Sequence, residues 1–263
     1  MGANDKMIAK KEGGVGYVIF NNPERHNAVS LEMWEATAEV LKDFAKDDAV
    51  RVAVLTGAGG KAFVSGADIS KFADERGTQK AVDHYNAATE RAFRSVHEFP
   101  KPTLAMIRGF CMGGGLALAV NCDIRIASDN SRFALPAAKL GLGYGYSGLK
   151  RFIEAVGPAF TKEIFFTARQ FDAAEARDMG LVNRVLPDGE VEAFVKGYAA
   201  IIAANAPLTI AAIKFIVGEA LKDESKRDLA ACEALVRKCF ASSDYEEGRK
   251  AFMEKRKPSF TGR

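Results

Sequence analysis

The first half of the chain alternates short apolar runs with longer amphipathic segments. Apolar runs predict strands at residues 16–20, 51–56 and 103–107. Helical spacing of apolar residues follows Ser30, a good N-cap residue, and recurs over residues 79–98, which stop before two prolines. This alternation predicts an α/β body.

The second half changes character after two further short strands, predicted at residues 123–127 and 132–135. From Gly148 onward the pattern is helical, with one strand at 181–186. The last four helices are predicted at residues 189–204, 207–221, 226–240 and 243–254. Few residues remain to cover their apolar faces, so this tail is expected to pack on the body or on another subunit.

Size and composition narrow the class of protein. The 263 residues allow one large domain, or one domain with a small appendage. The net charge of +3 is too small to indicate nucleic-acid binding by itself, and charged residues interrupt every apolar run that approaches membrane length. The N-terminus lacks the apolar core of a signal peptide, and none of the four cysteines forms a CxxC pair. A reducing, cytoplasmic location is the simplest interpretation.

Three consecutive glycines, Gly113 to Gly115, open an apolar helix. Glycine costs conformational entropy inside a helix, so the run needs a reason, and a helix start supplies one. The first N–H groups of a helix have no helical partner and carry the positive end of the dipole. Residues 62–69 form a second segment where bare backbone can meet a ligand. Two backbone donors aimed at one oxygen would form an oxyanion hole.

Several motifs occur in a characteristic order along nearly the whole chain. They lie at residues 21–28, 63–69, 113–115, 122–127, 173–176, 180–185 and 251–256. Together they resemble the crotonase (enoyl-CoA hydratase/isomerase) superfamily. The resemblance implies a spiral of β-β-α units over residues 1–200 and a C-terminal helical region, residues 201–263, that covers CoA and forms homotrimers or homohexamers. It also implies an acyl-CoA substrate, with CoA entering as part of the substrate, no tightly bound cofactor and no metal.

The resemblance also assigns site residues. The backbone N–H groups of Ala67 and Gly114 would form the oxyanion hole for a thioester carbonyl. Phe252 and Lys255 would reach CoA, from the same or a neighbouring subunit. The adenosine part of CoA would lie near Arg25, His26, Ala28, Ser65, Asp68 and Ile69.

Two departures from the family pattern concern proton transfer. The catalytic glutamates of the hydratases fall on Ala117 and Ala137 here. Because alanine cannot act as an acid or a base, a two-glutamate hydration is excluded. Tyr144 lies where a tyrosine occurs in members resembling methylmalonyl-CoA decarboxylase, although those members have histidine at the position of Ala67.

The leading hypothesis is an enzyme that stabilises a thioester enolate of an acyl-CoA. An acyl-CoA decarboxylase is the first alternative, because loss of CO2 itself produces the enolate and needs only the hole and a proton donor. A non-catalytic CoA-thioester-binding protein and an RNA-binding family member are the others. Lysine and arginine are dispersed and balanced by 34 acidic residues, which argues against RNA.

Overall fold

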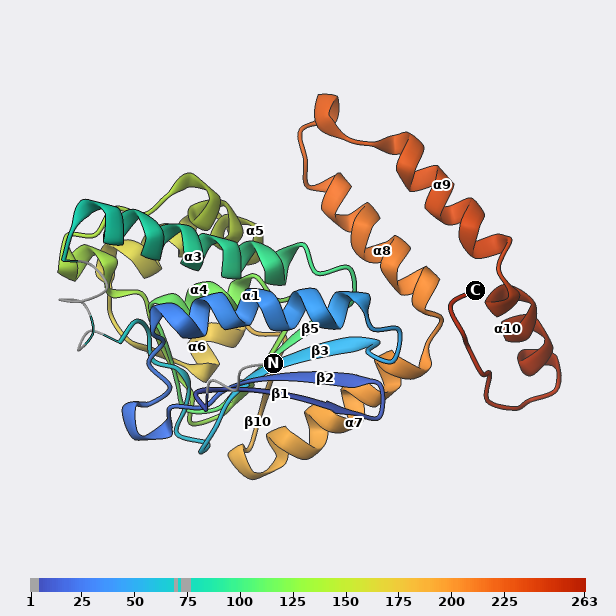
Figure 1. Cartoon of the computed structure of the whole chain (residues 1–263), viewed down its shortest axis with the longest axis horizontal. Helices are drawn as coiled ribbons and strands as arrows, with labels where there is room; N and C mark the ends of the chain where they lie inside the picture. The colour runs from blue at the N-terminus through green and yellow to red at the C-terminus, as the bar shows by residue number, and fades with distance from the viewer. Residues whose placement is uncertain (1–4, 69–70, 72–76) are drawn as a thin grey trace.

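The computed structural model describes residues 5–68, 71 and 77–263, and its strands form two sheets (Figure 1). The larger sheet has the order β1-β2-β3-β5-β7-β10, and the smaller has the order β4-β6-β8-β9. The larger contains β1 (Met7–Glu12), β2 (Val15–Phe20), β3 (Val52–Gly57), β5 (Thr103–Ile107), β7 (Ile124–Ser128) and β10 (Arg184–Leu186). The smaller contains β4 (Ala62–Val64), β6 (Phe110–Met112), β8 (Arg132–Ala134) and β9 (Phe171–Asp172).

The helices surround these sheets and extend beyond them. They are α1 (Leu31–Lys46), α3 (Gln79–His97), α4 (Gly114–Val120), α5 (Tyr146–Thr167), α6 (Ala173–Asp178), α7 (Val191–Ala204), α8 (Pro207–Ala220), α9 (Leu229–Phe240) and α10 (Ser243–Met253). Short 3-10 turns are η1 (Pro23–Arg25), η3 (Pro136–Leu140), η4 (Asp188–Glu190) and η5 (Glu224–Lys226).

The chain winds through three similar β-β-α turns, namely β3-β4-α3, β5-β6-α4 and β7-β8-α5. In each turn the first strand joins the larger sheet and the second joins the smaller sheet. Successive turns stack in parallel, since β3 pairs with β5, β5 with β7, β4 with β6 and β6 with β8. The expected spiral of β-β-α units with a C-terminal helical region is confirmed.

The central strands of the larger sheet are buried on both faces. Ala53 and Leu55 of β3 pack in the main core with residues of α1, α3 and α4. Val52 and Val54, which alternate with them, pack in a second cluster that includes Val191 of α7. A strand buried on both faces explains why β3 and β5 are continuous apolar runs in the sequence.

The last helices leave the body (Figure 1). Helix α7 lies on the sheet through Val191, Val195 and Ala199, whereas α8, α9 and α10 project to one side. Helix α7 ends at Ala204, and the first helix of the projecting region, α8, begins at Pro207. No single helix of the described residues has the length and apolar composition to cross a membrane; residues 188–204 and 207–220 meet those criteria only as a pair, bent by 102°.

Some elements differ from expectation for physical reasons. Strand β1 is an exposed edge strand with lysines, so it lacks an apolar pattern. Strands β4 and β6 have three residues each, too few for periodicity to register. The strand expected from residue 181 begins at Arg184. Ser30 does precede α1, but its side chain makes no capping hydrogen bond, and its buried Oγ has no partner among the described groups.

Candidate active site

The glycine run begins α4 where the two sheets approach each other. Gly113 is the N-cap with φ of 51°, a backbone conformation that favours glycine, and its N–H donates to the Ala134 carbonyl at 2.8 Å. A Cβ added at Gly115 would lie 2.1 Å from the carbonyl oxygen of Val64 in β4. The first turn of α4 therefore rests directly on the backbone of the smaller sheet, which only glycine permits.

Ala67 is held by one isolated parallel bridge to Val29. The N–H of Val29 donates to the Gly66 carbonyl at 2.8 Å, and the N–H of Asp68 donates to the Val29 carbonyl at 2.9 Å. In a parallel pair, the residue between these two contacts directs its own N–H away from the partner strand. The N–H of Ala67 therefore points away from Val29. Gly66 Cα lies 3.9 Å from where a Cβ on Gly113 would be, so this segment and the glycine run are in contact.

Trp34 supports the glycine run from α1. A Cβ added at Gly114 would lie 3.1 Å from the Trp34 ring, so the first helical residue of α4 packs directly on that side chain. The indole Nε1 donates to the Tyr85 hydroxyl of α3 at 3.0 Å, and the ring packs edge-on against Phe93. The spacing of α1 identifies Trp34 only as an apolar-face residue; its contact with Gly114 carries no signal in the sequence.

Most of the residues expected near adenosine lie together around η1. The Arg25 guanidinium is 3.2 Å from the buried Asp68 carboxylate. The N–H of Ser65 donates to the His26 carbonyl at 3.2 Å, and the N–H of Ala28 donates to the Arg25 carbonyl at 3.0 Å. The structure therefore joins these five residues to the segment that carries Ala67. Ile69 lies outside the described residues.

The two C-terminal site residues lie elsewhere in this chain. Phe252 is 81% exposed near the end of α10, and Lys255 follows that helix. Figure 1 places α10 at the end of the projecting region, well separated from α4. Within one chain, Phe252 and Lys255 are thus not brought to Ala67 and Gly114.

Tyr144 precedes α5 in an aromatic cluster. Its ring centroid lies 4.8 Å from that of Phe165 and 6.5 Å from that of Phe152. Burial raises the pKa of the Tyr144 hydroxyl above its ordinary value of 10, so the group stays protonated at neutral pH. Tyr144 can therefore donate a hydrogen bond, and it gives up its proton less readily than an exposed tyrosine.

Alanine occupies the positions of the two family glutamates. Ala117 follows Gly114 by three residues on α4, and Ala137 lies in η3; both are buried. Their methyl groups have no ionisable proton and cannot act as an acid or a base. Across residues 5–68, 71 and 77–263, no group of three or more His, Cys, Asp and Glu side chains is placed to hold a metal ion.

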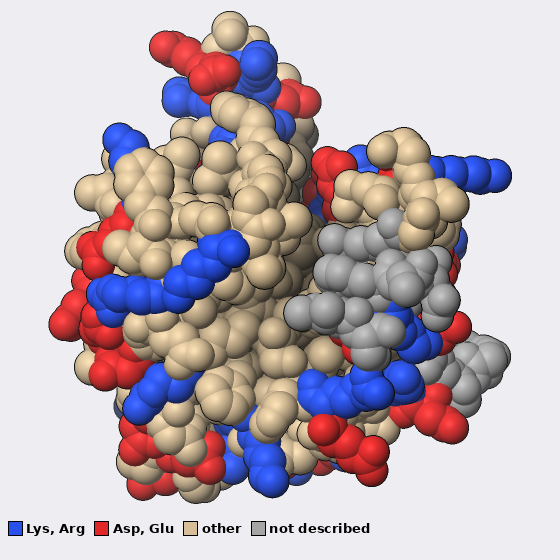
Figure 2. Space-filling model, turned by 90° about the vertical axis from the view of Figure 1, so that its left-hand side faces the viewer, with Lys and Arg blue, Asp and Glu red and all other residues tan. Residues whose placement is uncertain are grey.

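The end of the molecule at the left of Figure 1 has a broad uncharged centre (Figure 2). Side chains of both charges surround it. Leu140 at the end of η3, Leu142 after it and Tyr146 at the start of α5 are exposed.

A model of the enoyl-CoA hydratase/isomerase family matches residues 10–263. The chain belongs to this family. A short-chain-enoyl-CoA hydratase of Clostridium acetobutylicum is 34% identical over 96% of both chains. A crotonyl-CoA hydratase of Syntrophomonas wolfei is 33% identical over 98% of both chains. The superfamily membership predicted from the ordered motifs is confirmed, although each motif alone is short.

Solved structures show the same relationship for the fold. An enoyl-CoA hydratase/carnithine racemase from Magnetospirillum magneticum superposes with a TM-score of 0.92 at 35% identity, covering 99% of this chain and 97% of that chain. A putative member of the enoyl-CoA hydratase/isomerase family from Hyphomonas neptunium also gives a TM-score of 0.92, at 32% identity. Both comparisons cover nearly the whole chain, so the family fold includes the projecting helices.

Proposed function

We propose that this protein is an enzyme that acts on acyl-CoA thioesters by stabilising a thioester enolate. The N–H groups of Ala67 and Gly114 would donate to the thioester oxygen. The observation that carries the proposal is the contact between the Gly66 and Gly113 backbones, together with a bridge that turns the Ala67 N–H away from Val29. Gly114 opens α4, where N–H groups have no helical partner.

The proposed hole acts where charge develops. When a proton or CO2 leaves the carbon next to the thioester, the electron pair moves onto the carbonyl oxygen. Donors already in position lose little on reorganisation, and each contributes roughly 3–4 kcal/mol to the transition state. Trp34 beneath Gly114 and Val64 against Gly115 hold the first turn of α4 in place, which is the preorganisation that such a site needs.

CoA recognition is assigned to two groups of residues. The group around η1 would contact adenosine, and the ion pair between Arg25 and Asp68 links η1 to the segment that carries Ala67. Phe252 and Lys255 would come from a neighbouring copy, because α10 lies away from this chain's own α4. The proposed assembly is a homotrimer or homohexamer, for which light scattering would give three or six times the 28.4 kDa chain mass.

The proton chemistry separates two candidate reactions. With alanine at positions 117 and 137, hydration through two glutamates is not available. Enolate chemistry with another acid or base is the first candidate. Decarboxylation of an acyl-CoA is the second, with the Tyr144 hydroxyl as the proposed donor that quenches the enolate.

One assay distinguishes these reactions. The protein is incubated in D2O with crotonyl-CoA, methylmalonyl-CoA and an unsubstituted acyl-CoA, and the products are followed by mass. Loss of CO2 with uptake of one deuterium, reduced in Tyr144→Phe, supports decarboxylation. Fast hydration of crotonyl-CoA that Tyr144→Phe retains contradicts decarboxylation.

Two other outcomes bear on catalysis itself. Tight binding of CoA thioesters without turnover and without deuterium exchange contradicts the enzyme proposal and favours a binding protein. Salt-dependent binding of RNA, measured by filter retention between low and high salt, favours the RNA-binding alternative.

A further inference from the structure

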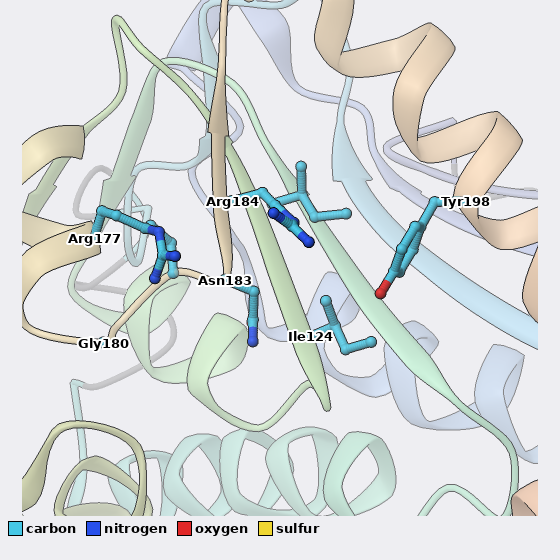
Figure 3. A pocket seen from close by; sticks show the side chains of 8 residues that line it. Ile124, Arg177, Gly180, Asn183, Arg184 and Tyr198 are labelled. Carbon is cyan, nitrogen blue, oxygen red and sulfur yellow. The ribbon is translucent and has the colours of Figure 1, made fainter.

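A pocket lies on the opposite face of the larger sheet from α4. Its volume is about 350 Å³, and its lining comes from β7, α6, β10, α7 and the segment between α6 and β10 (Figure 3). Ile126 of β7 belongs to the cluster under α7, whereas its neighbour Ala127 belongs to the main core with α4. The sheet therefore separates this pocket from Ala67 and Gly114.

The lining is cationic. Arg177 of α6 and Arg184 of β10 both line the pocket, and neither has a carboxylate within 4 Å among the described residues. Two guanidinium groups without a paired carboxylate raise the local potential and attract anions.

The remaining polar groups are also donors. The side-chain oxygen of Asn183 accepts from the backbone N–H of Arg125 at 2.8 Å, which leaves its NH2 group to donate. Figure 3 shows the polar ends of Arg184 and Tyr198 directed toward the same space, with Asn183 between Arg184 and Arg177. A lining of donors matches a ligand group that only accepts hydrogen bonds, such as a carboxylate or phosphate.

The floor of the pocket is apolar. Ile124, Ile126 and Val182 line it, and the last two are almost fully buried. Tyr198 forms one wall and stacks on Phe194 at 5.6 Å, so its ring is held in place. A volume of about 350 Å³ accommodates a compact organic body beside the charged group.

The geometry points to a binding site for a small organic oxyanion, in which Arg177, Arg184 and Asn183 hold a carboxylate or phosphate group. The ligand's compact apolar body lies on Ile124 and Val182. The site is independent of the proposed acyl-CoA chemistry, since the sheet separates the two.

Calorimetric titration of the full chain tests this assignment with four probes: inorganic phosphate, phenyl phosphate, benzoate and the cation benzylamine. The two organic anions are expected to bind, benzylamine is not, and affinity falls as salt rises. Phenyl phosphate binding above inorganic phosphate reports the apolar floor. The comparison of phenyl phosphate with benzoate distinguishes phosphate from carboxylate as the preferred group.

Variants place the binding in this pocket. Arg184→Gln and Arg177→Gln are each expected to weaken anion binding at least tenfold. Arg237→Gln, which removes an exposed arginine of α9 paired with Glu233, is the matched control and leaves binding unchanged. Saturating CoA is not expected to displace the anion.

Three results would overturn the assignment. The first is no binding of any anionic probe at millimolar concentration. The second is equal binding by wild type and a folded Arg184→Gln. The third is a change of oligomeric mass in the arginine variants without a change in anion binding, which would make the pocket a contact between copies. A failure of acyl-CoA turnover alone leaves the pocket result standing, so the two proposals are tested separately.

Discussion

Helices α7 and α8 have similar composition and opposite surroundings. Each has 14 residues and is mostly apolar. Helix α7 buries Val191, Val195 and Ala199 against the larger sheet. Helix α8 leaves Ile213 and Val217 57% and 56% exposed. An apolar face in a sequence therefore predicts that the helix is buried against a partner. It does not show whether that partner is part of the same chain.

The same contrast extends to how tightly each region is held. In the body, α4 meets β4 with no room for a single carbon atom at Gly115. The projecting region is tied to the body by polar contacts such as Lys214 Nζ to Asp123 Oδ2, at 2.8 Å. Close packing thus fixes the geometry of the site in the body. The positions of the projecting helices depend on a few polar contacts and on the surface that packs against their exposed apolar faces.

The largest effect is expected from Gly115→Ala. The added Cβ would meet the Val64 carbonyl oxygen, which is backbone and cannot rotate aside. We expect a loss of more than about 3 kcal/mol of unfolding free energy, measured by urea denaturation. A folded variant with wild-type stability would show that α4 does not rest on β4 as described.

Asp123→Ala should loosen the projecting region. The Asp123 carboxylate accepts from the Thr103 N–H at 2.7 Å and from Lys214 Nζ, so its removal leaves a buried backbone donor without that partner. We expect a loss of about 2 kcal/mol. Hydrogen exchange should rise in α8 and at the start of β5.

The control for Asp123→Ala is Asp223→Ala, which breaks only the exposed pair with Lys226. Equal exchange in α8 for both variants would contradict an anchoring role for Asp123.

Protonation of His97 is expected to have a smaller effect on stability. His97 is the last residue of α3 and lies near the charged groups of Arg151, Lys214 and Asp123. Burial, with Arg151 nearby, lowers the pKa of His97 from 6.5 to about 4. Since the unfolded chain binds the proton more readily, stability should fall as pH drops from about 6.5 toward 4. The expected loss is about 2 kcal/mol, after allowance for partial exposure.

His97→Gln cannot take up this proton, so its unfolding free energy should vary less between pH 7 and pH 4.5 than that of wild type. At pH 7.5 and above the wild-type histidine is neutral in both states, which makes that range the internal control. Parallel pH profiles for the two proteins would contradict the assignment.

The smallest effect belongs to Gly218→Ala in α8, the counterpart of Gly115→Ala. Among the described residues, no atom outside the backbone and chain neighbours of its own helix lies within 4 Å of a Cβ added at Gly218. Alanine should therefore add about 0.5–1 kcal/mol of stability through helix propensity, seen as a higher midpoint of denaturation. A destabilised variant would indicate that a second copy packs closely on this position.

The sequence predicted the long elements well because their signals are local. The apolar runs of β2, β3 and β5 and the spacing of α1, α3 and α7 to α10 all appear in the structure. The order of motifs also predicted the family. Strand β1 was missed because it is an exposed edge strand without an apolar pattern. The three-residue strands β4 and β6 were missed because they are short and pair with strands distant in sequence.

The candidate site also combines residues that a local sequence pattern predicts with contacts that only the fold reveals. Gly114 and Ala67 were predicted from a glycine run and a motif, and their placement relative to each other needed the fold. No local sequence pattern predicts the contact of Trp34 with Gly114 or the pocket of Arg177 and Arg184, because these residues come from separate elements. The requirement for glycine at position 115 likewise comes from close contact with Val64, fifty-one residues earlier.

The carbonyl stretching frequency of a bound acyl-CoA tests the central claim most directly. An acyl-CoA labelled with 13C at the thioester carbonyl is compared free and bound by difference infrared spectroscopy. Two donors at Ala67 and Gly114 should polarise the carbonyl and shift its band to lower frequency, and Gly114→Pro, which removes one donor, should reduce the shift. A bound carbonyl with the frequency of the free thioester, or an equal shift in a folded Gly114→Pro, would contradict the oxyanion hole.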